Sequence, residues 1–377
     1  MKIGINGYEA VVPRFGFDED GLPNRVGSSE VCFQLLNKLH KIDSINSYVI
    51  YLPFAPTSDL PGETEKWQYK IIPAKRLWTL FALQKAARKD KLDIFFNPTH
   101  YSPFFLNCPQ IITILDVSYK YFPELFKKKD LYKLSLWGKY SVRNASKILT
   151  ISEHSKDDIM KEYGVSPSKI SVLHVGIKDE VISKMTKEEF SKKYNVHTPY
   201  ILFVGTIQPR KNIKKLIEAF SVIADKNKDV NLAIVGKKGW MYEEILTADK
   251  EFGVEKRVSF FHDVSNEDLP FFYKYAECFV LPSLYEGFGL PVLEAMRYGC
   301  PVITSDISSL PEAGGDAALY VDPNNVSDIS EKIDKVLNDK SLRERMIKKG
   351  HEQVKKFSWE KAAKEVLETF NEFKPHE

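Results

Sequence analysis

Short apolar runs alternate with amphipathic stretches through the first half of the chain. The runs have the length of buried strands and fall at residues 2–5, 47–51, 94–96, 110–115 and 147–151. Apolar residues at helical spacing predict helices at residues 28–40, 77–89, 129–144 and 155–163. This alternation predicts a parallel sheet that is covered by helices.

The second half of the chain repeats this pattern after a polar connection near residues 176–182, which predicts a hinge between two domains. Strands are predicted at residues 198–204, 231–235, 257–261, 278–282 and 301–305. Helices are predicted at residues 213–224, 266–276, 328–338, 341–355 and 358–370. A chain of 377 residues is long enough for about two such domains.

Composition is that of an ordinary soluble enzyme, with 43% hydrophobic and 28% charged residues. The net charge of +3 is too small to favour nucleic acid as a partner. The four cysteines lack Cys-x-x-Cys spacing, which favours reduced core residues over a zinc site or disulfides. A strand that starts at Lys2 leaves no room for a signal peptide, and no apolar run is long enough to span a bilayer. We therefore expect a cytoplasmic protein.

The strongest candidate chemistry lies where the strand at residues 278–282 passes into a helix that begins near Pro291. Loops between a strand end and a helix start face the ligand crevice of an α/β sheet. Gly289 lets the backbone approach a ligand closely, and the amides from Gly289 to Val292 are expected to be free at the helix start. Such a helix start favours an anion such as a diphosphate.

Two carboxylates flank this loop, Glu286 before the helix and Glu294 within its first turns. Their positions suit a ligand that has hydroxyls at both ends and phosphates between them, which describes a nucleotide sugar. The alternative is that Glu294 only stabilises the first turns of its helix and that the glycines only mark the loop.

A second candidate site follows the strand at residues 198–204, where Gly205 precedes the cations Arg210 and Lys211. Arginine offers a fork to phosphate oxygens, and lysine offers a mobile point charge, so this turn is suited to a diphosphate. A solvated pair of cations is the alternative interpretation. The Gly-x-Gly-x-x-Gly fingerprint of nicotinamide cofactors is missing from the sequence.

The segment from Glu286 to Glu294, Glu-Gly-Phe-Gly-Leu-Pro-Val-Leu-Glu, resembles the signature of the retaining glycosyltransferases of family 4, which have the GT-B fold. The resemblance implies two Rossmann-like domains that face each other across a cleft. Residues 1–178 would then bind the acceptor and residues 179–355 the nucleotide sugar, while the helix in residues 356–377 crosses back to pack on the first domain. It also implies an enzyme that needs neither a metal nor a further cofactor.

The resemblance assigns roles within the second domain. Glu286 would hold the hydroxyls of the transferred sugar, and Glu294 the ribose hydroxyls. The donor would also be contacted by the residues after Glu286, which are Gly287, Phe288, Gly289 and Leu290. Val264, after the strand at residues 257–261, is a candidate contact to the base.

The phosphate turn departs from the family pattern, in which an arginine directly follows the glycine and a lysine stands five positions later. Here Thr206 occupies the arginine position and Lys211 keeps the lysine position. We expect Arg210 to restore the missing charge and to stabilise the departing diphosphate together with Lys211 and the helix start.

In the first domain the family carries a glycine-rich loop against the donor phosphates, which points to Gly27; a plain capped helix is the alternative. The family also carries a His-Asp pair where this chain has Leu115 and Asp116. Either Asp116 or His100 then contacts the sugars, or no base is needed because the leaving phosphate takes the proton of the acceptor in a same-face reaction. The acidic triplet 18–20 is expected to be a solvated turn and not a metal site.

Residues 120–147 are basic, aromatic and amphipathic. Such a stretch is typical of an ordinary solvated helix face, or of peripheral contact with the anionic inner face of a membrane, which would suit a lipid-linked acceptor.

The predicted function is transfer of a hexose from a nucleotide sugar to a glycan or lipid-linked acceptor, as in polysaccharide biosynthesis. The motif Gly-x-x-x-Pro-Arg-Lys-Asn at residues 205–212 resembles the mannosyltransferase branch, which favours GDP-mannose over a UDP-sugar. A sugar phosphorylase, a sugar-nucleotide epimerase of the same fold and a two-domain sugar-binding protein remain as alternatives.

Overall fold

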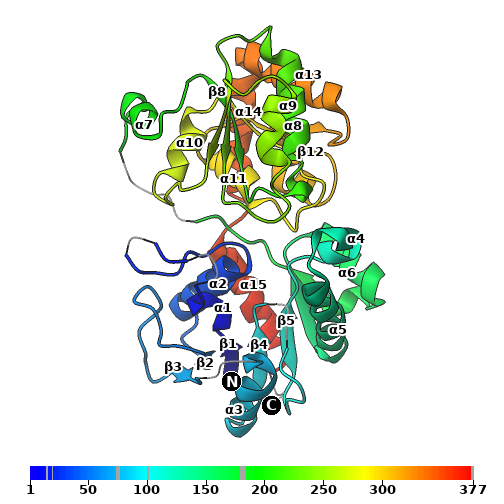
Figure 1. The fold of residues 1–377 in the computed structure, drawn as a ribbon. Coiled ribbons are helices and arrows are strands. Elements are labelled where there is room, and N and C mark those ends of the chain that lie inside the picture. The colour runs from blue at the N-terminus through cyan, green and yellow to red at the C-terminus, as the bar shows by residue number, and fades with distance from the viewer. Residues whose placement is uncertain (14–15, 19, 74–76, 100–101, 179–183, 375–377) are drawn as a thin grey trace. The chain divides into compact units, whose positions relative to one another are not determined.

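The computed structural model describes the chain except for residues 14–15, 19, 74–76, 100–101, 179–183 and 375–377. It divides into two compact units (Figure 1). The first unit contains residues 1–176 together with residues 357–377, and the second contains residues 177–356. Each unit is built on its own parallel sheet.

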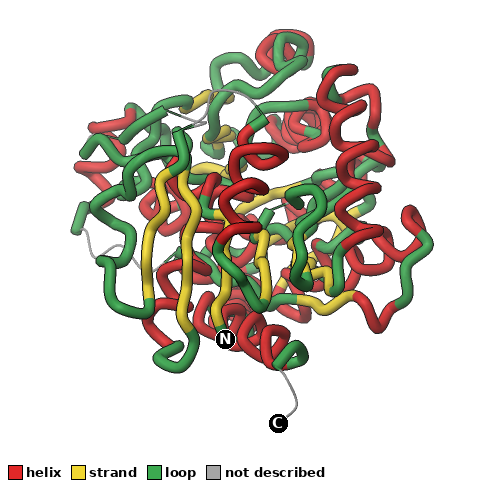
Figure 2. Tube along the Cα trace, turned by 90° about the horizontal axis from the view of Figure 1, so that it is seen from below, coloured by secondary structure: helices red, strands yellow, loops and turns green. Residues whose placement is uncertain are grey.

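Within the described residues, the sheet of the first unit has seven strands in the order β3-β2-β1-β4-β5-β6-β7. Figure 2 shows them in yellow, side by side. Every neighbouring pair is parallel, and the central strands are buried on both faces, which accounts for their continuous apolar sequence. The strands are β1 (Lys2–Asn6), β2 (Ser47–Leu52), β3 (Trp67–Ile71), β4 (Ile94–Asn97), β5 (Gln110–Thr113), β6 (Lys147–Thr150) and β7 (Ile170–Val172). The five predicted strands are confirmed, whereas β3 and β7 were not predicted.

The helices of the first unit confirm the predicted ones, with one difference. The single helix predicted at residues 77–89 is a π-helical segment, η1 (Trp78–Leu83), that continues into α3 (Gln84–Lys89). The longer helices are α2 (Ser28–Ile42), α5 (Lys128–Asn144) and α6 (Glu153–Tyr163). The short elements are α1 (Tyr8–Val11), α4 (Ser118–Tyr121), η2 (Pro123–Leu125) and η3 (Pro167–Lys169).

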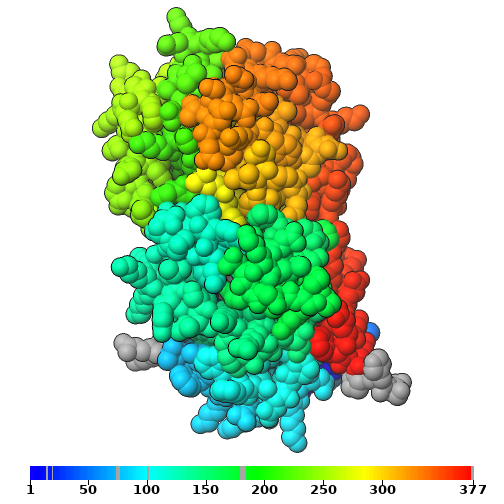
Figure 3. Space-filling model, turned by 90° about the vertical axis from the view of Figure 1, so that its right-hand side faces the viewer, coloured from blue at the N-terminus to red at the C-terminus, as the bar shows by residue number. Residues whose placement is uncertain are grey.

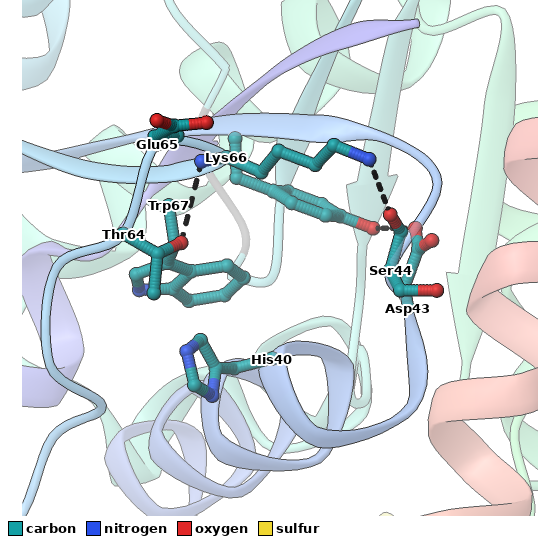
Figure 4. Close-up of a pocket in the computed structure, with 8 residues that line it drawn as sticks. His40, Asp43, Ser44, Thr64, Glu65, Lys66 and Trp67 are labelled. Atoms are coloured by element: carbon teal, nitrogen blue, oxygen red, sulfur yellow. Dashed lines mark hydrogen bonds between the residues drawn. The ribbon is translucent and has the colours of Figure 1, made fainter.

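The edge strand β3 is held by side chains that sequence patterning does not reveal. The ring of His40, near the end of α2, meets the edge of the Trp67 indole at 5.1 Å between centroids (Figure 4). Lys66 Nζ donates a hydrogen bond of 2.6 Å to the carbonyl oxygen of Ser44. These contacts surround a cavity of about 410 Å³ and tie the strand to the segment that follows α2.

The last helix, α15 (Trp359–Asn371), belongs to the first unit and packs against α2. Ser358 caps it by accepting a hydrogen bond of 3.1 Å from the amide of Lys361. The ring of Phe370 lies 5.4 Å from that of Phe96 on β4. Gly176 permits this packing, because a Cβ at that position would lie 2.4 Å from the backbone nitrogen of Trp359.

Among the described residues of the second unit, six parallel strands follow the order β10-β9-β8-β11-β12-β13. They are β8 (Tyr200–Val204), β9 (Asn231–Val235), β10 (Val258–Phe261), β11 (Cys278–Leu281), β12 (Val302–Ser305) and β13 (Ala318–Val321). The five predicted strands are confirmed, and β13 was not predicted. Strands β8, β11 and β12 are buried along their whole length.

The longer helices of the second unit are α7 (Lys187–Tyr194), α8 (Ile213–Ala224), α11 (Leu290–Arg297), α13 (Val326–Asn338) and α14 (Lys340–Val354). The short ones are η4 (Pro209–Lys211), η5 (Ile245–Thr247), α9 (Ala248–Glu251), α10 (Leu269–Tyr275), α12 (Leu310–Gly314) and η6 (Gly315–Ala317). One face of α8 is apolar and buried, including Leu216, Phe220 and Ile223, which explains its helical pattern in the sequence.

All four cysteines are free thiols, and Cys32, Cys278 and Cys300 are buried. In the part of the chain that the structure describes, no helix is both long and apolar enough to cross a bilayer.

Candidate active site

The candidate site lies at the carboxyl ends of β8 and β11 in the second unit. These strands are neighbours at the centre of the sheet, although β9 and β10 separate them in sequence. The chain therefore runs from β8 towards one edge of the sheet and returns to the other side of β8. Ligands of open α/β sheets bind at such a switch point. The two segments predicted to carry the chemistry, residues 205–212 and 282–294, begin at these two strand ends.

A buried cluster of three charges forms there. Lys211 Nζ lies 2.6 Å from Oε1 of Glu286, and Arg210 Nη1 lies 3.3 Å from Oε2. Arg210 also donates a hydrogen bond to the carbonyl oxygen of Tyr285. The side chains of Arg210, Lys211 and Glu286 are only 15%, 10% and 9% exposed. The predicted pair of cations is therefore not an ordinary solvated pair.

The cations decide the charge of the carboxylate. Burial alone raises the pKa of Glu286, but the charge of Lys211 and then that of Arg210 outweigh the burial and bring the pKa from 4.5 to about 2. Glu286 is therefore ionised at neutral pH, and it accepts hydrogen bonds instead of supplying a proton.

The loop that carries Glu286 is fixed by two serines that the sequence did not single out. The backbone amide of Glu286 donates to Ser308 Oγ at 3.0 Å, and its carbonyl oxygen accepts from Ser308 Oγ at 2.7 Å and Ser309 Oγ at 2.8 Å. Gly289 then adopts a φ of 108°, a conformation that favours glycine, and leads into α11.

The helix start offers fewer amides than the sequence predicted. The amide of Val292 donates to the carbonyl oxygen of Gly289 at 2.9 Å, and Pro291 has no N–H. The expectation of free amides from Gly289 to Val292 is therefore wrong for these two positions.

The segment after β8 is fixed by its neighbour after β9. The amide of Gly205 donates to Val235, and that of Ile207 donates to Lys237, both at 2.9 Å. A Cβ on Gly236 would lie 1.9 Å from the carbonyl oxygen of Gly205, so this close approach of the two segments requires glycine at position 236. η4 then places Arg210 and Lys211 side by side. Asn212 leads into α8, and its side-chain amide donates a hydrogen bond of 2.7 Å to the carbonyl oxygen of Pro323.

Glu294 lies half-buried on α11, where Oε2 accepts a hydrogen bond of 2.8 Å from the hydroxyl of Tyr273. Tyr273 is fully buried, and its pKa is raised well above 10 by burial and by the neighbouring carboxylate. Tyr273 is a residue that the sequence analysis missed, because nothing in the pattern of α10 distinguishes it from a core aromatic.

The other predicted residues of the second unit are arranged as follows. Gly287 and Phe288 are buried in the loop. Leu290 begins α11, and Thr206 is half-buried beside Gly239. Val264 is half-buried three residues after β10.

The predicted residues Gly27 and Asp116 belong to the first unit. Gly27 is exposed with a φ of 56° and directly precedes α2. Asp116 Oδ1 accepts hydrogen bonds from the amide (2.9 Å) and hydroxyl (2.7 Å) of Ser118, so it stabilises the start of α4. His100 lies outside the described residues.

In the part of the chain that the structure describes, no group of three His, Cys, Asp or Glu side chains is placed to hold a metal ion. In the acidic turn, Asp18 Oδ1 accepts from the amides of Asp20 and Leu22.

Comparison with known proteins identifies what this arrangement is. The family described as "Glycosyl transferases group 1" matches residues 184–353, and "Glycosyltransferase Family 4" matches residues 29–181. The chain is 33% identical over 308 residues to O-antigen chain mannosyltransferase B of Escherichia coli, covering 80% of this chain and 78% of the relative. It is 36% identical over 231 residues to O-antigen chain mannosyltransferase RfbU of Salmonella typhimurium, covering 60% of each.

Solved structures share the fold at low identity. Sucrose-phosphate synthase from Thermosynechococcus elongatus matches with a TM-score of 0.74 at 18% identity, over 99% of this chain and 98% of that one. HepE from Anabaena, solved with UDP-glucose, matches at 0.72 and 17% identity, over 99% and 100%. The protein is thus a glycosyltransferase with two Rossmann-like domains, the GT-B fold. Within that class the chain belongs to glycosyltransferase family 4.

The charge cluster generates a stability prediction. Glu286→Gln keeps the shape of the side chain but leaves Lys211 and Arg210 buried without their counter-charge. Breaking a buried pair in this way typically destabilises a protein by roughly 3–5 kcal/mol. We expect a loss of this order in urea unfolding at pH 7. The matched control is Glu352→Gln, which removes an exposed partner of Lys355 and should change stability little.

The same variant tests how stability depends on pH. Because folding lowers the pKa of Glu286, the stabilisation from its ionised carboxylate is complete above pH 4.5 and is lost as the pH falls towards about 2. The difference in stability between the native protein and Glu286→Gln should therefore narrow below pH 4.5. A variant as stable as the Glu352→Gln control at pH 7 would show that the cluster does not form.

Proposed function

We propose that the enzyme transfers mannose from GDP-mannose, with retention of configuration, to a glycan or lipid-linked acceptor. The observation that carries the proposal is the pairing of Lys211 and Arg210 with Glu286 at the switch point of the second unit's sheet. The mannosyltransferase names of the relatives support the choice of sugar. In this proposal the second unit binds the donor and the first unit binds the acceptor.

The two cations serve the leaving group. The diphosphate gains negative charge as its bond to the sugar breaks, so fixed cations beside it stabilise the transition state more than the ground state. Lys211 and Arg210 are already fixed by Glu286 and by the backbone of Tyr285. No reorganisation is then needed when charge develops, and two cations supply the charge that a metal ion provides in other enzymes.

The two carboxylates would hold the ends of the donor. Glu286 is ionised at neutral pH, so it is suited to accept hydrogen bonds from the hydroxyls of the transferred sugar. Glu294 is oriented by the buried hydroxyl of Tyr273 and would accept from the ribose. Backbone at Gly287 to Leu290 and at Val264, with the side chain of Thr206, would complete the donor site.

The proton of the acceptor hydroxyl requires a destination. In a same-face reaction the leaving phosphate oxygen takes it, and the protein contributes position and charge. Asp116, which already accepts from Ser118, and His100 remain the proposed contacts to the sugars, and Gly27 to the phosphates.

A UDP-sugar is the second candidate donor, since HepE is a structural neighbour that was solved with UDP-glucose. The two candidates differ in the base and in the transferred sugar, so both are offered in the same assay below.

Replacing the cations tests the donor site. Arg210→Ala and Lys211→Ala should each lower kcat/KM by about a hundredfold or more, since one lost contact to developing charge removes about 2.7–4 kcal/mol of stabilisation. The control is Lys214→Ala, whose lysine is 41% exposed on α8 and pairs with Glu251. Transfer is measured with GDP-mannose and with UDP-glucose as donors, and circular dichroism checks that each variant is folded. NMR of the product determines its anomeric configuration.

Two results of this assay would contradict the proposal. A folded variant lacking both cations that transfers sugar at the native rate would remove the phosphate assignment. Faster turnover of UDP-glucose than of GDP-mannose would transfer the proposal to the second donor.

We also propose that the basic stretch 120–147 contacts an anionic membrane surface. Six of its basic side chains are exposed, on or beside α5: Lys127, Lys128, Lys129, Lys133, Lys139 and Arg143. By residue number, the stretch belongs to the cyan and green part of Figure 3. Each lysine near such a surface contributes on the order of 1 kcal/mol, so several are needed for attachment.

Vesicle sedimentation tests this contact. Lys128→Glu with Lys129→Glu should weaken binding to phosphatidylserine vesicles by more than about tenfold, and neutral vesicles should not bind. The matched control reverses Lys348 and Lys349, which are exposed on α14. Equal binding of both double variants would assign α5 to an ordinary solvated face.

A further inference from the structure

The first unit has a switch point of its own. In its sheet β1 lies between β2 and β4, so the chain turns back beside the carboxyl ends of β1 and β4. These strands end at Asn6 and Asn97. Asn6 Nδ2 donates a buried hydrogen bond of 2.9 Å to Asn97 Oδ1. A cavity of about 530 Å³ opens at this point, within the range of small-molecule sites.

The cavity has a polar side made of uncharged and acidic groups. Asn6, Glu9 and Thr99 line it, and they are 3%, 7% and 8% exposed. Asp130 adds a second carboxylate, and Lys133 is the cation among the lining residues that the structure describes. In this described part of the lining, two carboxylates face one ammonium, a balance that disfavours an anionic ligand, in contrast to the cations of the second unit. The groups suit the hydroxyls of a neutral ligand.

The walls are aromatic. Tyr8 and Trp78 lie on one side with ring centroids 5.3 Å apart, and Phe104 and Trp137 lie 6.2 Å apart. Both indole N–H groups donate to the backbone, Trp78 to Ile72 at 2.7 Å and Trp137 to Ser102 at 3.0 Å. The rings are therefore held in place, and they offer apolar surface to a ligand.

The mouth of the cavity is lined by apolar side chains that are left in water. Leu77, Tyr132 and Leu136 line it, and they are 53%, 69% and 55% exposed. Tyr132 and Leu136 are one turn apart on α5. Leu77 has a φ of 50°, which is costly for this residue type, and it leads into the π-helical η1. Exposed apolar clusters and π-helical segments both concentrate at functional sites.

We propose that this cavity binds a neutral sugar ring of the acceptor. The apolar C–H face of a pyranose would lie on the aromatic walls, and its hydroxyls would meet Asn6, Glu9 and Thr99. A lipid chain would offer no hydrogen-bonding groups to that polar side, and a phosphate would meet the carboxylates of Glu9 and Asp130. The proposal rests on the glycosyl transfer proposed above, because it names the sugar that receives the hexose.

Binding without donor tests the cavity directly. Saturation-transfer NMR and tryptophan fluorescence are recorded on the full chain with methyl α-D-mannopyranoside and with an α-linked mannobiose. Tyr132→Ala and Leu136→Ala should each weaken binding, by about tenfold for the aromatic residue. Both side chains are mostly exposed, so the fold should survive. The control is Ile45→Ala, whose residue is 74% exposed between α2 and β2 and should bind as the native protein does.

The remaining measurements separate the possible results. Thermal stabilisation by GDP should be unchanged in the three variants, while KM for the acceptor rises in the first two. Absence of sugar binding to the native protein, or equal binding by Tyr132→Ala and Ile45→Ala, would overturn the proposal. Loss of vesicle binding with intact sugar binding in Tyr132→Ala would assign the mouth to a membrane instead. Sugar binding without turnover of any donor would leave the cavity standing and remove the proposed function.

Discussion

The contact on which the site depends is the buried pairing of one carboxylate with two cations, Glu286 with Lys211 and Arg210. Each charge alone would be costly to bury, and together they are held at the carboxyl ends of β8 and β11. The pairing joins two loops that the sheet brings together, and Ser308 and Ser309 fix the backbone on the carboxylate side. The proposed diphosphate site is thereby organised before a substrate arrives, which is the condition for strong electrostatic stabilisation of a leaving group.

The two units use one topological device with opposite chemistry. In each, a central strand pairs with the next strand of the chain on one side and with a later strand on the other, and the chain reversal leaves a place for a ligand at the strand ends. In the second unit that place holds lysine and arginine. In the first unit it holds asparagine, carboxylates and aromatic rings. This difference matches the two substrates of a glycosyltransferase, a charged nucleotide sugar and an acceptor that is proposed to present a neutral ring.

The sequence predicted the frame of both units because buried parallel strands have continuous apolar sequences. It could not predict β3, because the strand is held by contacts with a distant segment, of Trp67 with His40 and of Lys66 with Ser44. It indicated Glu286, Arg210 and Lys211 one by one, yet their pairing spans 75 residues and follows only from the strand order. The helical pattern at residues 77–89 concealed the π-helical η1 and thus the aromatic wall. The amide of Val292 was expected to be free, but a tight turn from Gly289 uses it.

The charge state of Glu286 in the folded protein is the most direct test of this account. The ¹³C resonance of its side-chain carboxyl, assigned by comparison with Glu286→Gln, can be followed as the pH is lowered. At pH 4.5, where an ordinary glutamate is half protonated, we expect Glu286 still to be fully ionised. A carboxyl that titrates at 4.5 or higher would mean that Lys211 and Arg210 do not hold it, and the organised diphosphate site described here would be contradicted.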